Sequence, residues 1–232
     1  PMTFARRLSL AVFLSAFGWT LAPAQAPVDD DLGPRVRACG ACHGEHGRSA
    51  EEAYAPSIAG KPAGYLFEQL RNFRDGRRQN VVMQPMLAFL TDDYLREIAE
   101  HYASEEGAVR IAQRGASDDE LDAGRTLVEQ GDDARKLPAC PACHGDELLG
   151  HEPAIPGLLA LSPDYLAAQL GAWRNGVRNA KKPDCMAQVA SLLTPPEIAA
   201  VTAWISSRPV PAEHRPSADT PAKLPLACGA AP

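Results

Sequence analysis

The chain has 232 residues, which is enough for one large domain or for two domains of about 100 residues each. Its formal net charge of -6 disfavours nucleic acids and anionic lipids as partners. Aromatic residues make up only 6% of the chain, which is few for two protein cores, so something other than side chains is expected to fill part of the interior.

Residues 1–26 have the pattern of a secretory signal peptide. Arg6 and Arg7 form a basic region, residues 8–21 form an apolar stretch, and Ala24-Gln25-Ala26 matches a cleavage site. Cleavage after Ala26 is therefore expected, and it would release the mature chain into the periplasm. An uncleaved signal that holds the protein at the membrane is the alternative, although the apolar stretch is short for a bilayer span of about 20 residues.

Two copies of the pattern Cys-x-x-Cys-His follow, at residues 39–43 and 140–144. Two thiols on one helical turn can reach both vinyl groups of a haem, and the adjacent histidine can then bind the iron. The cysteines are Cys39, Cys42, Cys140 and Cys143, and the histidines are His43 and His144. The sequence therefore predicts two covalently bound haem c groups, each with one histidine ligand.

Three other roles for these cysteines fit the pattern less well. A zinc site would have to bring together two cysteine pairs from distant parts of the chain, and it would leave both histidines unexplained. A thioredoxin-like redox motif requires a βαβ context, and no alternating strand pattern is present. Two structural disulfides would not require the histidines.

The sequence after each haem motif is repeated, so that residues 65–78 resemble residues 165–178. Each copy has apolar residues at helical spacing. Capping residues predict helix starts at Thr91, Ser117, Ser162 and Thr194, and glycines predict helix ends at Gly76, Gly131 and Gly176. The predicted fold class is all-α.

The repeat divides the mature chain into two domains. The predicted boundaries are residues 27–104 for the first domain, 105–116 for a linker, 117–207 for the second domain and 208–232 for a Pro-rich C-terminal tail. Each domain is expected to hold one haem.

The second axial position of each iron is assigned to a methionine, the usual ligand in electron-transfer cytochromes. Met186, the only methionine of the second domain, lies seven residues before Leu193. Met83 lies at the same distance before Leu90, so the repeat favours Met83 over Met86. Met86 could instead fill a gap in the core.

Pro56 and Pro156 follow the haem-motif histidines by 13 and 12 residues. A chain that passes beneath the haem there could offer a carbonyl oxygen to the histidine Nδ1 and so orient the ring. An ordinary loop proline is the alternative. Four repeated arginines could pair with haem propionates or could be solvated charges: Arg74, Arg78, Arg174 and Arg178.

These motifs together resemble the cytochrome c4 family of dihaem class I c-type cytochromes. The resemblance extends from about residue 33 to residue 207 and rests on the paired haem motifs, the segments 56–60 and 83–91, and the long approach from Gly124 to Cys140. It implies two tandem class I cytochrome c domains related by pseudo-twofold symmetry, with haem propionates near the domain interface. The iron ligands that it implies are His43 and Met83 for one haem and His144 and Met186 for the other.

The resemblance implies an electron carrier rather than an enzyme, in which electrons pass from a quinol-oxidising complex or a periplasmic dehydrogenase to a terminal oxidase. A dedicated cytochrome subunit, as in flavocytochrome c sulfide dehydrogenase, is the first alternative. A dihaem enzyme such as thiosulfate dehydrogenase is the second. It would need an open iron or a cysteine ligand, for which Cys185 beside Met186 is the candidate.

Two cysteines remain outside the haem motifs and depart from the family pattern. Cys185 directly precedes Met186, and Cys228 lies in the tail. In an oxidising compartment such a pair tends to form a disulfide, which would exclude Cys185 as an iron ligand. Two free thiols are the alternative.

Overall fold

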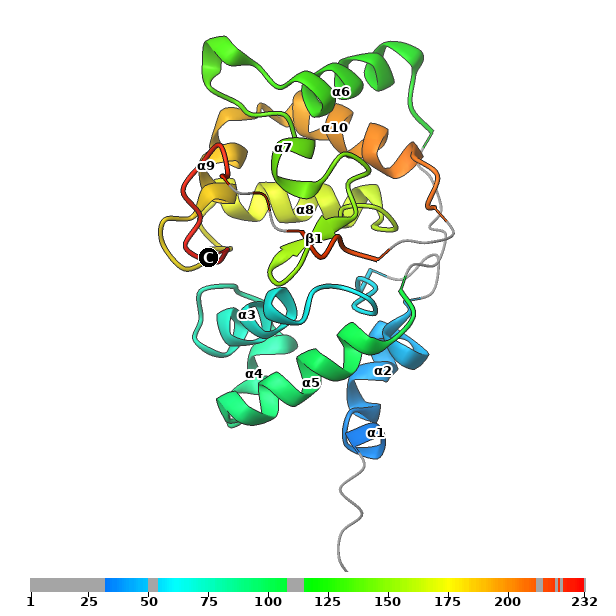
Figure 1. The fold of residues 1–232 in the computed structure, drawn as a ribbon, viewed down its shortest axis with the longest axis vertical. Helices are drawn as coiled ribbons and strands as arrows, with labels where there is room; N and C mark the ends of the chain where they lie inside the picture. Colours follow the sequence, from blue (N-terminus) through cyan, green and yellow to red (C-terminus); the bar gives the residue numbers. More distant parts are fainter. Residues whose placement is uncertain are drawn as a thin grey trace, which may run out of the picture. The chain divides into compact units, whose positions relative to one another are not determined.

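The computed structural model describes residues 32–49, 54–107, 115–211, 215–219, 221 and 223–231. The predicted signal peptide and most of the predicted linker lie outside these residues. We call residues 32–107 the first half and residues 115–231 the second half. Figure 1 shows that α3, α4 and α5 lie beside one another in the first half, as do α6, α8 and α10 in the second.

The helices follow the same order in both halves. In the first half they are α1 (Leu32–Arg35), α2 (Arg37–His43), the 3-10 turn η1 (Glu45–Gly47), α3 (Ala63–Arg74), α4 (Met83–Leu87) and α5 (Asp92–Ser104). In the second half they are α6 (Asp118–Gln130), the 3-10 turn η2 (Asp133–Arg135), α7 (Pro141–His144), α8 (Pro163–Arg174), α9 (Cys185–Leu192) and α10 (Pro195–Ser207). The all-α prediction is confirmed, with one addition. The short antiparallel strands β1 (Gly150–His151) and β2 (Ile155–Pro156) pair with each other, and two residues per strand are too few for an alternating pattern to predict them.

The predicted capping residues begin the helices to which they were assigned. The hydroxyl oxygens of Thr91, Ser117, Ser162 and Thr194 each accept a hydrogen bond from a backbone N–H in the first turn. Gly76 and Gly176 follow the ends of α3 and α8 in the left-handed region, with φ of 76° and 71°, where a side chain would be strained. Local sequence thus sets these helix boundaries.

Apolar side chains from the helices fill a core in each half. In the second half Val128 of α6 packs with Leu166 of α8 and Val201 of α10. Gly124 allows α6 to approach α10, because a Cβ atom at this position would lie 2.1 Å from the carbonyl oxygen of Ala200. The corresponding core of the first half is formed by α2, α3 and α5.

Reciprocal backbone hydrogen bonds join the two halves. The N–H of Gln79 donates to the carbonyl oxygen of Val177 at 2.9 Å, and the N–H of Asn179 donates to that of Arg77 at 2.7 Å. Each bond is the counterpart of the other under the sequence repeat. This reciprocity is what a pseudo-twofold axis between two similar domains requires.

No helix among the described residues is by itself long and apolar enough to cross a membrane. The pair α9 and α10 meets that criterion of length and composition only when taken together, and the two helices meet at an angle of 113°.

The start of α10 supplies a testable contribution to stability. Hydrogen bonds from Arg135, at 2.8 and 3.1 Å, and from the Thr194 backbone lower the pKa of Glu197 to about 2. We expect Glu197→Gln to lower the free energy of unfolding at pH 7 by roughly 0.5 kcal/mol, because glutamine can keep the capping hydrogen bond but loses the ion pair with Arg135. A carboxylate whose folded-state pKa is depressed stabilises the protein above its unfolded pKa of about 4.3, and this contribution disappears as the pH falls towards 2.

Urea unfolding of Glu197→Gln and the wild type at pH 7, 4 and 3 would measure this difference. Glu129→Gln, at an exposed site near the end of α6, is the control and should cause little change. A difference that stays constant over the whole pH range would show that the ion pair with Arg135 does not cause it.

Candidate functional site

The two Cys-x-x-Cys-His motifs occupy equivalent helical turns. Residues 39–43 lie in α2, and residues 140–144 form α7 with its N-cap residue. The four cysteines of the motifs are all unpaired thiols. Among the residues that the structure describes, no cluster of three or more His, Cys, Asp or Glu side chains could hold a metal ion, so the structure does not support the zinc alternative.

Burial sets the protonation of these groups. It raises the pKa of Cys140 to about 12 and also raises the pKa of Cys39 and Cys143. Thioredoxin-like motifs depend on a lowered thiol pKa, so these thiols do not fit that role. Burial also lowers the pKa of His43 and His144, which favours the neutral imidazole that can bind a metal.

Each motif histidine is held through one ring nitrogen. The Nδ1 atom of His43 lies 2.8 Å from the carbonyl oxygen of Pro56, and that of His144 lies 2.8 Å from the carbonyl oxygen of Pro156. With Nδ1–H as the donor in both pairs, the Nε2 atoms carry the free lone pairs. In both halves the structure therefore presents an oriented imidazole beside two unpaired thiols, as covalent haem attachment requires.

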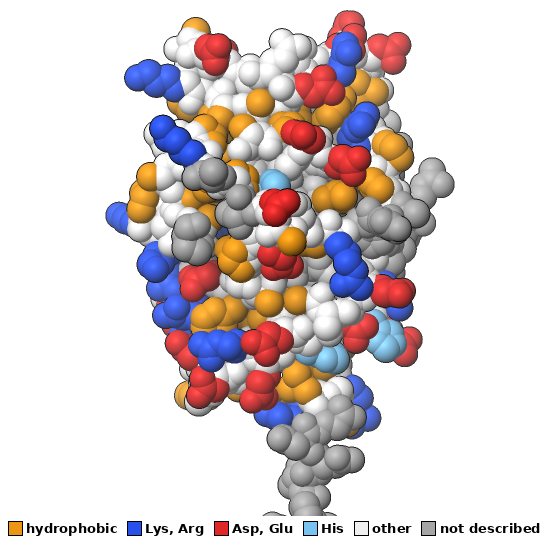
Figure 2. All heavy atoms as spheres, viewed as in Figure 1, with side chains coloured by type: hydrophobic (Ala, Val, Ile, Leu, Met, Phe, Trp, Pro, Cys, Tyr) orange, Lys and Arg blue, Asp and Glu red, His pale blue; other side chains and the backbone are white. Residues whose placement is uncertain are grey.

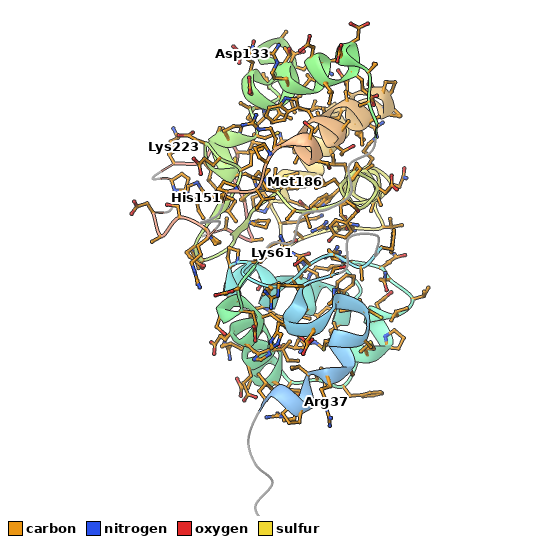
Figure 3. All side chains as sticks on the ribbon, turned by 90° about the vertical axis from the view of Figure 1, so that its right-hand side faces the viewer. Arg37, Lys61, Asp133, His151, Met186 and Lys223 are labelled. Atoms are coloured by element: carbon orange, nitrogen blue, oxygen red, sulfur yellow. A yellow bond between two sulfur atoms is a disulfide. The ribbon has the colours of Figure 1, made fainter. Side chains whose placement is uncertain are left out.

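The candidate methionines lie at the starts of two equivalent helices. Met83 is the first residue of α4 and packs beside Phe73, Leu87 and Leu95, whereas Met86 is 42% exposed. Met186 is the second residue of α9 and is half-buried, and Figure 3 labels it. The burial of Met83 and the exposure of Met86 therefore favour Met83 as the iron ligand, as the sequence repeat does.

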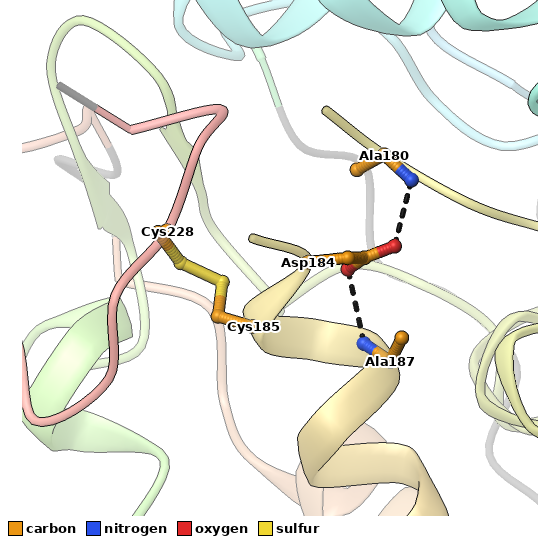
Figure 4. Close-up of a disulfide and its surroundings, with 5 residues drawn as sticks. All are labelled: Ala180, Asp184, Cys185, Ala187 and Cys228. Carbon is orange, nitrogen blue, oxygen red and sulfur yellow. Dashed lines mark hydrogen bonds between the residues drawn. A yellow bond between two sulfur atoms is a disulfide. The ribbon is translucent and has the colours of Figure 1, made fainter. Parts of the chain in front are cut away.

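Polar side chains that the sequence interpretation did not single out hold these helix starts. The Oδ1 atom of Asn80 accepts from the N–H groups of Val82 and Met83, both at 2.9 Å. The Oδ1 atom of Asp184 accepts from Ala187 N at 3.0 Å, and its Oδ2 accepts from Ala180 N at 2.7 Å (Figure 4). An Asx residue two or three positions before each methionine is the signal that could have identified them.

Arg74 and Arg174 hold the segments that follow the methionines. Arg74 donates to the carbonyl oxygen of Leu90 at 3.0 Å and forms an ion pair with Asp92 at 2.7 Å. Arg174 donates to the carbonyl oxygens of Leu193 and Ala190. These hydrogen bonds tie α3 and α8 to the segments after α4 and α9.

Arg78 and Arg178 lie between the two halves and are 8% and 5% exposed. The Oε1 atoms of Gln69 and Gln169 each accept hydrogen bonds from both arginines at 2.7 to 3.1 Å, and Arg78 also donates to the Tyr165 hydroxyl at 2.9 Å. Neither arginine has a carboxylate within ion-pair distance among the described residues. Two buried cations with neutral partners fit a cofactor that brings carboxylates of its own, as haem does with its propionates.

The remaining two cysteines form a disulfide. Cys185 and Cys228 are bonded, with their Cα atoms 5.0 Å apart, which confirms the predicted bridge and shows that the free-thiol alternative is wrong (Figure 4). Beside the bridge, the N–H of Gly229 donates to the carbonyl oxygen of Pro183 at 2.8 Å. A bonded Cys185 has no thiolate to offer an iron, so the structure does not support it as a ligand.

Comparison with known proteins finds relatives over most of the chain, although no protein-family model matches it. A thiosulfate dehydrogenase electron acceptor from Stutzerimonas stutzeri is 35% identical over 75% of this chain and 80% of that protein. A cytochrome c4 from Pseudomonas aeruginosa is 34% identical over 74% of this chain and 84% of that protein.

The fold is shared by solved structures of related proteins. Reduced cytochrome c4 from Pseudomonas stutzeri matches with a TM-score of 0.64 and 30% identity, over 75% of this chain and 95% of that one. A thiosulfate dehydrogenase from Marichromatium purpuratum matches with a TM-score of 0.66 and 35% identity, over 74% of this chain. This chain spans only 36% of that longer protein.

Proposed function

Because this chain belongs to the cytochrome c4 family, we propose that it is a periplasmic carrier that takes electrons from a dehydrogenase or a quinol-oxidising complex and delivers them to a terminal oxidase. Family membership makes the chain a dihaem c-type cytochrome, with two tandem class I cytochrome c domains and two covalently bound haem c groups. The periplasmic location is proposed from the pattern of residues 1–26.

The proposed iron ligands are His43 and Met83 in the first domain and His144 and Met186 in the second. Haem supplies one-electron redox chemistry when bound. The carbonyl oxygens of Pro56 and Pro156 orient the imidazoles and increase their basicity by accepting the Nδ1 protons. The observation that carries this proposal is the oriented histidine beside two unpaired thiols, which occurs once in each half.

Other side chains complete each proposed site. Asn80 and Asp184 fix the helix starts that carry the methionines, and Arg74 and Arg174 fix the segments behind them. The thiols of Cys39, Cys42, Cys140 and Cys143 are the proposed attachment points. With two strong axial ligands on each iron, no position is left for a substrate, so we propose electron exchange without catalytic turnover by this chain alone.

The donor that we favour is a thiosulfate dehydrogenase, because the Stutzerimonas stutzeri relative is named as an electron acceptor for that enzyme. A second candidate role is a dedicated subunit of such a dehydrogenase. It is favoured by the match of this chain to part of the longer Marichromatium purpuratum protein.

The test combines the oxidised dihaem protein with a thiosulfate dehydrogenase and thiosulfate. We expect both haems to become reduced, as followed by visible absorbance, with no reduction when the dehydrogenase is left out. Oxidation of thiosulfate by the isolated chain with an artificial acceptor would contradict the carrier role and favour the enzyme alternative. Stoichiometric co-purification of the two proteins through high salt would favour the subunit role over the free carrier.

A further inference from the structure

Lys61 belongs to the first half but contacts the second. Figure 3 shows it where the two halves meet, on the segment that leads into α3. Its Nζ atom donates to the carbonyl oxygen of Gly157 at 3.4 Å, across 96 positions of the sequence. Gly157 directly follows Pro156, whose carbonyl oxygen accepts the Nδ1–H of His144. The amino group therefore lies beside the peptide that holds the histidine of the second site.

Among the described residues, no carboxylate lies within ion-pair distance of Lys61. Burial lowers the pKa of Lys61, and the neighbouring Tyr165 opposes this shift. A cation with few counter-charges acts over a longer range in a low-dielectric interior than at the surface.

The sequence repeat shows that only the first half has a lysine at this position. The position equivalent to Lys61 is Leu161, which is 7% exposed and packs in the core of the second half. The two segments adopt the same backbone conformation, because Gly60 and Ala160 both have left-handed φ angles, of 67° and 56°. Pro62 and Ser162 then serve as the N-caps of α3 and α8. Lys61 and Leu161 are thus structural counterparts with different charges.

We propose that Lys61, supplied by the first domain, raises the reduction potential of the second haem relative to that of the first, so that an electron shared by the protein resides preferentially on the second haem. The inference rests on the proposed function, and it assigns a direction to electron movement within that function. A positive charge near an iron site favours the reduced state, which carries one positive charge fewer. Leu161, the counterpart of Lys61 in the repeat, carries no charge and therefore makes no such contribution to the first site.

The test is a potentiometric titration of the intact dihaem protein, followed by paramagnetic resonance. Loss of one low-spin signal in Met83→Ala and of the other in Met186→Ala would assign the two signals to the two haems. We expect Lys61→Met to shift the electron distribution between the haems towards the first by on the order of tenfold. This corresponds to a decrease of about 59 mV in the potential of the second haem, with the first unchanged.

Two further variants separate the charge from packing. Lys61→Arg keeps the charge and should leave the second potential close to that of the wild type. Leu161→Met, the matched change at the equivalent position, alters packing without charge and should shift neither potential. An unchanged second potential in Lys61→Met, or an equal shift of both haems, would overturn the inference. Absence of the two low-spin signals in the wild type would instead contradict the proposed ligation.

Discussion

Met83→Ala and Met186→Ala are each expected to leave one axial position of one iron vacant and to leave the ligands of the other iron unchanged. Each methionine lies in the first turn of a helix, at the same distance before the next helix of its half, and each helix start is held by an Asx side chain. Removing the thioether leaves five ligands on one iron, so that iron should become high-spin and bind carbon monoxide, one molecule per protein. Optical spectra with and without carbon monoxide would measure this.

Met86→Ala is the control for the first site. Its side chain is 42% exposed, so the variant should keep the wild-type spectrum and bind no carbon monoxide. If Met83→Ala also kept the wild-type spectrum, Met83 would not be the ligand. The same result for Met186→Ala would remove the assignment in the second domain.

Loss of the disulfide is expected to destabilise the second domain. Cys185 and Cys228 are 43 positions apart, and closing a loop of this length in the unfolded chain corresponds to a stabilisation of roughly 3 to 4 kcal/mol in the chain-entropy model. We therefore expect Cys185→Ser and Cys228→Ser each to lower the free energy of unfolding by about this amount. Chemical denaturation of the oxidised protein would measure it.

The double variant is the matched control for the disulfide. It should be about as stable as either single variant, because the first substitution already breaks the bond. Thiol counting on denatured, unreduced wild-type protein should find no free thiol, since the other cysteines are expected to be bonded to haem. One or more free thiols, or single variants as stable as the wild type, would contradict the contribution assigned to the bridge.

Features that depend on local chemistry could be predicted from the sequence. Thr91, Ser117, Ser162 and Thr194 mark helix starts because a hydroxyl satisfies backbone donors wherever a helix begins. The Cys-x-x-Cys-His spacing identifies the haem motifs because all of its atoms lie on one turn. The pairing of Cys185 with Cys228 followed from elimination, since the other four cysteines had a role.

Features that depend on the contact between the two halves could not be predicted. Arg74 and Arg78 both recur in the repeat, so the sequence does not distinguish their roles. In the structure, Arg74 binds the segment after Met83, whereas Arg78 is buried between the halves. The position of Lys61 beside Gly157 joins residues 96 positions apart, and no local pattern encodes that distance. Strands β1 and β2 are too short for periodicity to reveal them.

Paramagnetic resonance of the oxidised wild-type protein tests the central claim most directly, because it reports the axial ligands of both haems at once. If each half holds one haem between a histidine and a methionine, two low-spin His/Met signals of equal intensity should appear, without a high-spin component. A high-spin signal, or a low-spin signal typical of a thiolate ligand, would contradict a carrier with two closed irons and would favour a dihaem enzyme.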